Sequence, residues 1–160
     1  MSESQTTEVL NRYEICAPFL RAGFVPYLPE FESGVDFILY READDLLFKV
    51  QLKSRWTVDR KYFGRNIWVA FPIMTGAVRS WHLAPHDLLV RHGQVRHGHT
   101  SSWNSGGYSN ARPSLTFRNL YAPFEIGSLL AGLSREWVAS VTAEGAVTWD
   151  DPVAVPGLTA

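Results

Sequence analysis

Apolar residues recur at helical spacing near the start of the chain. The four positions are Leu10, Tyr13, Ala17 and Leu20. They predict a helix over residues 6–22 that is capped by Thr6 or Thr7 and kinked or split at Pro18, because a proline ring removes one backbone hydrogen bond. The preceding residues, 1–5, are polar and are expected to form a loose tail.

Short apolar runs between turn-forming residues predict a sheet in the next part of the chain. The expected strands cover residues 24–28, 35–40, 46–52, 67–73 and 78–83. The polar segment 42–45 joins the second and third of these strands in a hairpin. Further helices are expected over residues 85–90 and 125–141. Together these elements indicate an α/β fold in which helices flank a mixed central sheet.

Residues 92–114 carry no apolar pattern and are rich in Gly, Ser and His, so they are expected to form a long functional or mobile loop. Within it, Trp103 and Tyr108 either stack on a ligand or anchor the loop to the core. Residues 151–160 contain two prolines and a glycine and are expected to be a tail. Nothing marks a second domain, so residues 1–160 are interpreted as one domain.

Composition narrows the class of protein. Hydrophobic residues make up 46% and aromatic residues 13% of the 160 positions, which is enough for a real core. No apolar run reaches the roughly 18 residues of a membrane span, and the N-terminus lacks the features of a secretory signal. The single cysteine excludes an internal disulfide. A cytoplasmic protein with no membrane partner is therefore expected.

Charge is unevenly distributed, although the formal net charge is only −1. Residues 46–118 contain eleven Lys and Arg residues against two acidic residues. Such a basic centre favours a polyanionic partner, of which nucleic acid is the obvious example. It is equally explained by a solvated face whose charges pair with the acidic ends of the chain.

The predicted hairpin brings three polar residues together. Side chains alternate along a strand, so Gln51 and Lys53 share one face, and Asp36 lies across the hairpin from them. These groups suit phosphodiester hydrolysis. Asp36, Gln51 and the Leu52 carbonyl would bind Mg²⁺ or Mn²⁺, while Lys53 would orient the attacking water or stabilise the transition state.

The order of elements, with the segments GVDF and KVQLKSR, resembles the PD-(D/E)xK nuclease superfamily. Asp36 matches the Asp of the motif, and Gln51-Leu52-Lys53 matches its second part. Gln51 stands where Asp or Glu is usual, and this QxK variant is found in some members. The resemblance covers residues 6–73 and implies a restriction-endonuclease-like core with Mg²⁺-dependent endonuclease activity.

The resemblance also implies an acidic residue on the first helix that faces the site. Glu14 is preferred for this role and Glu8 is the second choice on the same helix. Glu30 and Glu32, in the loop before Asp36, are further alternatives for the charge that Gln51 does not supply.

Basic residues follow the motif directly and suit phosphate contacts beside the site, although a solvated turn explains them as well. They are Arg55, Arg60, Lys61 and Arg65. The expected function is a metal-dependent nuclease that acts on DNA, with a homodimer left open. The alternatives are a catalytically inactive module of the same fold that binds nucleic acid or a partner, and an interaction protein in which these polar residues are ordinary surface groups.

Overall fold

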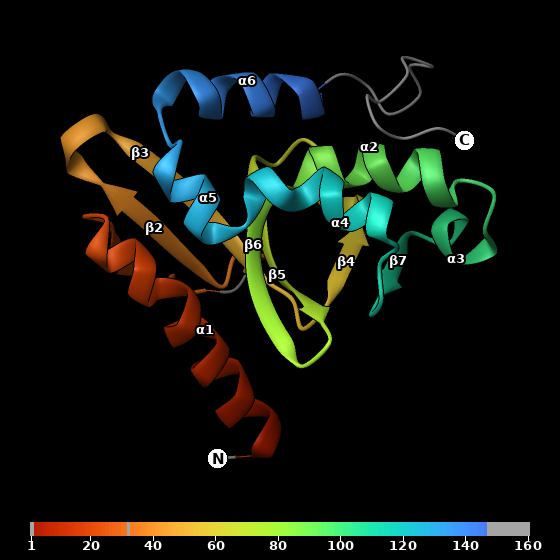
Figure 1. Cartoon of the computed structure of the whole chain (residues 1–160), viewed down its shortest axis with the longest axis horizontal. Helices are drawn as coiled ribbons and strands as arrows, with labels where there is room; N and C mark the ends of the chain where they lie inside the picture. The colour runs from red at the N-terminus through yellow and green to blue at the C-terminus, as the bar shows by residue number, and fades with distance from the viewer. Residues whose placement is uncertain (1, 32, 147–160) are drawn as a thin grey trace.

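The computed structural model describes residues 2–31 and 33–146, and it shows a mixed α/β arrangement with helices on both sides of a central sheet (Figure 1). The sheet has five strands in the order β1-β2-β3-β5-β6. Their bounds are β1 Val25–Tyr27, β2 Phe37–Arg41, β3 Leu46–Leu52, β5 Ile67–Thr75 and β6 Val78–Pro85. Neighbouring strands are antiparallel except β3 and β5, which are parallel, so the predicted mixed sheet is confirmed.

Six α-helices and a second, two-stranded sheet complete the described part of the chain. The helices are α1 Glu3–Arg21, α2 His86–His97, α3 Ser101–Asn104, α4 Leu115–Tyr121, α5 Ile126–Ala131 and α6 Arg135–Ala146. The short 3₁₀ turns are η1 Glu42–Asp44, η2 Arg60–Tyr62 and η3 Ala122–Phe124. Strands β4 Trp56–Asp59 and β7 Gly107–Asn110 form the second sheet.

The β2–β3 hairpin forms as predicted, with η1 as its turn. Asp45 ends this turn at φ 53°, a left-handed conformation that aspartate tolerates better than most side chains. The register pairs Phe37 with Val50 and Leu39 with Phe48, so these four apolar side chains share one face of the sheet. All four are fully buried.

Helices cover the two faces of the sheet by aromatic contacts. On the first face, Phe48 packs against Phe19 of α1, and Trp68 of β5 packs against Trp137 of α6. On the second face, Phe71 of β5 packs edge-on against Tyr121 of α4 at a centroid distance of 5.4 Å. The core is therefore two layers, one on each side of the sheet.

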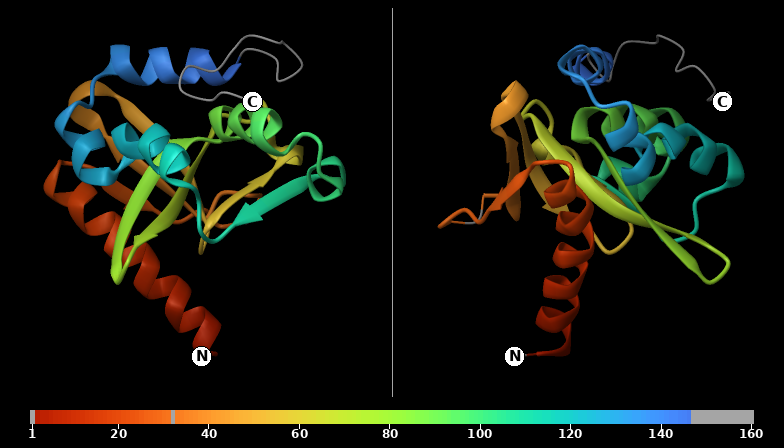
Figure 2. Two further views of the ribbon diagram at one scale, coloured as in Figure 1. Left: turned by 45° about the vertical axis from the view of Figure 1, so that its right-hand side comes forward. Right: turned by 60° about the vertical axis from the view of Figure 1, so that its left-hand side comes forward.

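Helix α1 differs from the expected one at its start and at Pro18. Ser2 caps the helix, and its side chain and that of Gln5 satisfy each other's backbone N–H groups. This capping box extends the helix back to Glu3, so the expected loose tail over residues 1–5 is wrong for residues 3–5. The helix runs through Pro18 without splitting. Its N-terminal part projects from the rest of the chain (Figure 2).

The expected long loop over residues 92–114 is also wrong. Helix α2 continues to His97, α3 and β7 follow, and β7 pairs with β4. Trp103 anchors this region, because its ring is fully buried and its indole N–H donates to the Gln94 side chain at 2.5 Å. Glycine at position 93 leaves room for that ring, since a Cβ there would lie 2.3 Å from it. Burial of Trp103 and the pairing of β7 with β4 give this polar segment its regular structure. A polar and apolar pattern within the segment does not predict either of them.

The predicted C-terminal helix over residues 125–141 is divided in two. Helix α5 ends at Ala131 and is capped by Gly132, whose N–H donates to the carbonyls of Leu129 and Ser128, and α6 begins at Arg135. The expected tail over residues 151–160 lies outside the described residues.

The buried histidine His92 makes stability depend on pH. Its ring lies 2.8 Å from the Tyr121 hydroxyl, and burial, aided by Arg91, lowers its pKa from 6.5 to about 3. Unfolding therefore takes up a proton between these values, and the contribution of His92 to stability is lost as pH falls from 6.5 towards 3.

Between pH 7 and pH 5 we expect this group alone to reduce the free energy of unfolding by about 2 kcal/mol. Urea unfolding at both pH values would measure it. His92→Gln should flatten this pH dependence, and the substitution His99→Gln at an exposed position should not.

Candidate functional site

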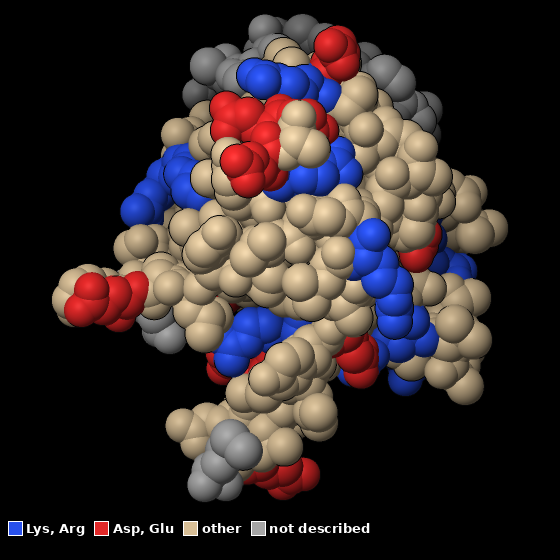
Figure 3. Space-filling model, turned by 90° about the vertical axis from the view of Figure 1, so that its left-hand side faces the viewer, with Lys and Arg blue, Asp and Glu red and all other residues tan. Residues whose placement is uncertain are grey.

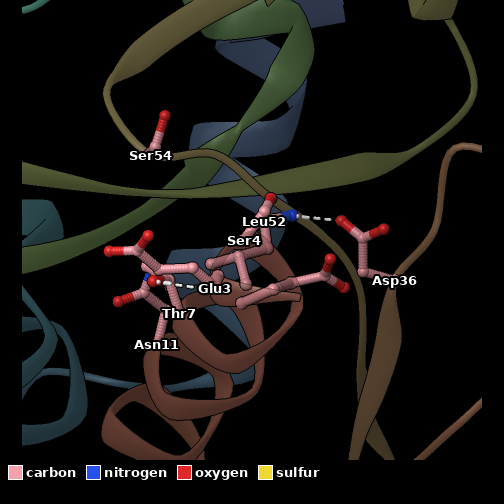
Figure 4. Close-up of a pocket in the computed structure, with 8 residues that line it drawn as sticks. Glu3, Ser4, Thr7, Asn11, Asp36, Leu52 and Ser54 are labelled. Carbon is pink, nitrogen blue, oxygen red and sulfur yellow. Dashed lines mark hydrogen bonds between the residues drawn. The ribbon is translucent and has the colours of Figure 1, made fainter. Parts of the chain in front are cut away.

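A cleft separates the projecting half of α1 from the ends of β2 and β3 (Figure 4). Its volume is about 540 Å³, and polar or acidic side chains dominate its lining. The lining residues are Glu3, Ser4, Thr7, Glu8, Asn11, Asp36, Leu52 and Ser54. Among the described residues that line it, three carry carboxylates and none is Lys, Arg or His.

The carboxylate of Asp36 is held in place by the backbone of β3. Asp36 directly precedes β2, and its N–H donates to the Val50 carbonyl at 2.8 Å. Its Oδ2 accepts a hydrogen bond from the Leu52 N–H at 2.5 Å, as Figure 4 shows. Within the described chain, Oδ1 makes no hydrogen bond and stays available to a ligand. The expectation that Asp36 meets the end of the second strand is confirmed.

Gln51 directly precedes Leu52 on β3, and its side-chain oxygen is buried without a hydrogen-bond donor. Its side chain is 3% exposed, and its Nε2 donates to the Gly34 carbonyl at 3.1 Å. Because the Gly34 carbonyl can only accept a hydrogen bond, the Gln51 Nε2 must be the atom that faces it. The Oε1 of Gln51 is then buried without a hydrogen bond. A buried oxygen without a donor is costly unless water or a cation satisfies it. The Gln51 oxygen is therefore an acceptor that a water molecule or a cation would satisfy.

Alternation along the strand separates the remaining motif residues. Leu52 and Ser54 line the cleft, whereas Gln51 and Lys53 are not among its lining residues. The Lys53 N–H donates to the Ala70 carbonyl at 2.8 Å, which fixes the end of β3 beside β5. In the described part of the chain, no carboxylate pairs with the half-buried Lys53 ammonium. Lys53 thus keeps an uncompensated positive charge one residue from the Leu52 N–H that holds Asp36.

The structure brings Glu8, and not Glu14, to this cleft. Glu14 accepts hydrogen bonds from Arg79 at 2.6 Å and from the Trp81 indole at 2.7 Å. Both partners lie on β6, at the opposite edge of the sheet from β1, and β3 and β5 separate β6 from β2, so Glu14 is engaged away from the cleft. The prediction that Glu14 faces the site is wrong, because helical spacing does not tell which side of the helix faces the cleft.

The other acidic candidates are distributed differently. Glu3 lines the cleft, although the sequence pattern predicts that it belongs to a loose tail over residues 1–5. The Ser2 and Gln5 capping box was the signal that would have placed Glu3 in the helix. Glu30 is exposed and is not among the lining residues, and Glu32 lies outside the described residues.

Most of the basic residues after the motif are held elsewhere. Arg60 donates to the Asn104 carbonyl and lies over the Trp103 ring, and Lys61 forms an ion pair with Asp59 at 3.1 Å. The Arg65 guanidinium lies over the Tyr62 ring. Arg55 is exposed and follows the lining residue Ser54, so of the four it is the one next to the cleft in sequence.

The donor atoms match a hard divalent cation in type but are few. Asp36 offers one free carboxylate oxygen, and Glu8 lines the same cleft, whereas the buried amide oxygen of Gln51 is not brought into that lining. The predicted sharing of one metal ion by Asp36 and Gln51 therefore stays a prediction. In residues 2–31 and 33–146, no three His, Cys, Asp or Glu side chains are grouped closely enough to hold a metal ion. Mg²⁺ usually keeps several waters and takes one or two carboxylates from the protein, so the set fits a largely hydrated ion.

Comparison with known proteins does not assign the chain to a family. No protein-family model matches the chain, and neither a curated protein nor a solved structure matches it significantly. None of the helices in the described part of the chain has the length and apolar character needed to cross a bilayer.

Proposed function

We propose that this protein is a metal-dependent nuclease that hydrolyses phosphodiester bonds in DNA, of the PD-(D/E)xK type with a QxK motif. The observation that carries the proposal is the Asp36 carboxylate, which the Leu52 N–H orients into an acidic cleft with one oxygen left free. A cytoplasmic location is part of the proposal, in line with the sequence.

Electrostatics supports dependence on a metal. Glu3, Glu8 and Asp36 line the cleft, and no cationic side chain among the described lining residues offsets them. A phosphodiester carries a negative charge and would be repelled there. Asp36 would hold a divalent cation in the cleft, with Glu8 adding negative charge and the Gln51 amide buried outside the lining. When bound, this cation would neutralise the scissile phosphate and lower the pKa of the attacking water.

The other residues of the motif have separate roles in this proposal. Lys53, free of an ion-pair partner in the described chain, would stabilise the extra negative charge that develops on the phosphoryl oxygens. Arg55, exposed beside the cleft residue Ser54, would contact a neighbouring phosphate. Hydrogen bonding by Leu52 and Gly34 would keep Asp36 and Gln51 in position before substrate arrives.

A cleavage assay tests the proposal directly. Purified protein would be incubated with supercoiled plasmid, single-stranded DNA and RNA in the presence of Mg²⁺, Mn²⁺ or EDTA. We expect nicking or linearisation of plasmid with either metal and none with EDTA. Cleavage that persists in EDTA would contradict the metal requirement, and the absence of cleavage of all three substrates would contradict the nuclease.

A non-catalytic nucleic-acid-binding module is the second candidate, and the low acid count at the site favours it. The described residues contain no group of three metal-binding side chains, and Gln51 brings no charge. Calorimetric titration separates the two candidates. Salt-dependent DNA binding without a heat of Mn²⁺ binding would favour the module, whereas a Mn²⁺ signal that Asp36→Asn removes would favour the nuclease.

The two glutamates of α1 give a matched comparison. We expect Glu8→Gln to reduce Mn²⁺-dependent cleavage by about 10-fold or more, because it removes a charge from the cleft. Glu14→Gln should cleave like the wild-type chain, since Glu14 is bound to Arg79 and Trp81. Initial rates at equal protein concentration would measure both. Loss of activity in Glu14→Gln with full activity in Glu8→Gln would reverse the assignment.

A further inference from the structure

Arginines from separate segments of the chain meet at one end of the small β4–β7 sheet. The register pairs Trp56, the first residue of β4, with Asn110, the last residue of β7. Because the two strands are antiparallel, the chain before Trp56 and the chain after Asn110 leave the sheet at the same end. Arg55 and Arg112 therefore lie at that end, which is also the end next to the cleft residue Ser54.

Arg96 reaches the same end of the β4–β7 sheet from the last turn of α2. It belongs to a second pocket, about 210 Å³ in volume, in which the end of α2, the end of β7 and the start of α4 lie close together (Figure 1). The lining residues are Arg96, His97, Asn110, Ser114 and Phe117. Arg112 lies in the chain between two of them, Asn110 and Ser114. We call Arg55, Arg96 and Arg112 the arginine rim.

The arginine rim carries positive charge that is not neutralised by ion pairs. Residues 88–124 contain four arginines and no Asp or Glu. Within residues 2–31 and 33–146, no arginine of the rim forms an ion pair. Burial lowers the pKa of His97, and the neighbouring His99 and Arg96 lower that pKa further, which indicates a positive potential at this pocket. On the side of the molecule away from β7, acidic and basic groups are instead intermixed (Figure 3).

We infer that the arginine rim binds the phosphate backbone of the DNA that the acidic cleft is proposed to cleave, so the choice of DNA as partner rests on the proposed function. Three carboxylates line the cleft, and before a metal binds they repel a polyanion, so the cleft itself is a poor source of affinity. Cations outside the cleft have to supply that affinity. A guanidinium group suits this role, because it donates two parallel hydrogen bonds to one phosphate.

The position of the arginine rim fits a strand of DNA that continues beyond the cleft. Arg55 and Arg112 are exposed, and Arg96 is half-buried at its pocket. They lie where the chain leaves the cleft residue Ser54 and enters β4, so they would hold phosphates that follow the scissile one. Contacts of this kind fix the position of the DNA without reading its sequence.

DNA binding in the absence of metal tests the arginine rim by itself. Fluorescence anisotropy of a labelled duplex of about 20 base pairs would be measured in EDTA, from about 50 to about 200 mM NaCl. We expect Arg96→Ala and Arg112→Ala each to raise the Kd by about five-fold or more. Each should also reduce the slope of log Kd against log salt concentration by about 0.9, the value for one lost phosphate contact. The double variant should lose about twice that slope.

Arg21→Ala is the matched control for these two variants. Arg21 is exposed in the last turn of α1, whereas the cleft is lined by the first part of that helix. The control removes the same charge from the chain, and we expect it to leave both the Kd and the salt slope unchanged. Circular dichroism would verify that each variant is folded. An equal loss of affinity in the control, or wild-type binding by the double variant, would overturn the inference.

The binding and cleavage assays distinguish failure of the arginine rim from failure of the nuclease. Binding that depends on Arg96 and Arg112, in a chain that cleaves no substrate, would support the rim and contradict the nuclease. Metal-dependent cleavage by a chain whose double variant binds DNA normally would contradict the rim alone. A wild-type chain that does not bind the duplex at about 50 mM NaCl would overturn the inference whether or not it cleaves.

Discussion

Replacing Asp36 with Asn is expected to reduce Mn²⁺-dependent cleavage of plasmid DNA by at least about 100-fold without unfolding the protein. Asparagine keeps an oxygen that can accept the hydrogen bond of the Leu52 N–H, so the local geometry is preserved. What is lost is the negative charge in the cleft. Cleavage rates measured across a Mn²⁺ titration would show whether high metal concentration restores part of the activity, as expected when the change weakens metal binding.

Lys53→Ala should lower cleavage to a similar extent but with a different dependence on metal. Its proposed role is to stabilise the transition state, so added Mn²⁺ should not restore activity. Lys49→Ala is the control on the same strand, because the Lys49 ammonium donates to the Arg65 carbonyl at 2.6 Å. If both Asp36→Asn and Lys53→Ala cleave as fast as the wild-type chain, the site assignment is wrong even where the protein is a nuclease.

Phe48→Ala is expected to have the largest effect on stability, a loss of about 3–5 kcal/mol in the free energy of unfolding. Phe48 is fully buried, and its ring contacts Phe19, Phe24 and Trp68 at centroid distances of 6.3, 5.7 and 4.7 Å. Truncation removes those contacts and leaves a cavity where α1, the chain after it and the sheet meet. A decrease in Tm of about 6–20 °C should accompany it.

The neighbouring residue Leu47 provides the control for this prediction. It lies on the same strand, points to the opposite face and is 49% exposed. Leu47→Ala should therefore cost less than about 1 kcal/mol. Urea unfolding of both variants, compared with the wild-type chain at pH 7, would give the two free energies. Similar losses in both variants would mean that the aromatic cluster around Phe48 is not a centre of the core.

Part of the site was accessible from local patterns. Residues 35–52 contain two strands with a polar turn between them, and strand alternation with antiparallel pairing was sufficient to predict that Asp36 meets the end of β3. The hydrogen bond between Asp36 and the Leu52 N–H is the result. The same reasoning placed Gln51 beside Asp36, but it did not show that the Gln51 amide turns to the Gly34 carbonyl and leaves a buried oxygen unsatisfied.

The region between residues 92 and 114 shows a limit of local patterns. Its polar composition predicted a loop, yet burial of Trp103 and pairing of β7 with β4 give it regular structure. Strand β4, the pairing partner of β7, is distant in sequence, so no spacing within the segment predicts this pairing. The sequence allows two roles for Trp103, and the full burial of its ring shows that it anchors the core.

The sequence alone established the hairpin and its polar end, because alternation and turn chemistry act between near neighbours. It also established that α1 is a helix, but not which side of it is inside. Ile15 with Phe19, and Leu10 with Tyr13, are both apolar sets at helical spacing, and packing against Phe48 selects the first. That choice brings Glu8 to the cleft that Asp36 lines, directs Glu14 to Arg79 and leaves Leu10, Tyr13 and Leu20 exposed. Only the tertiary structure decides it, because the free energy that orients a helix comes from burial against residues elsewhere in the chain.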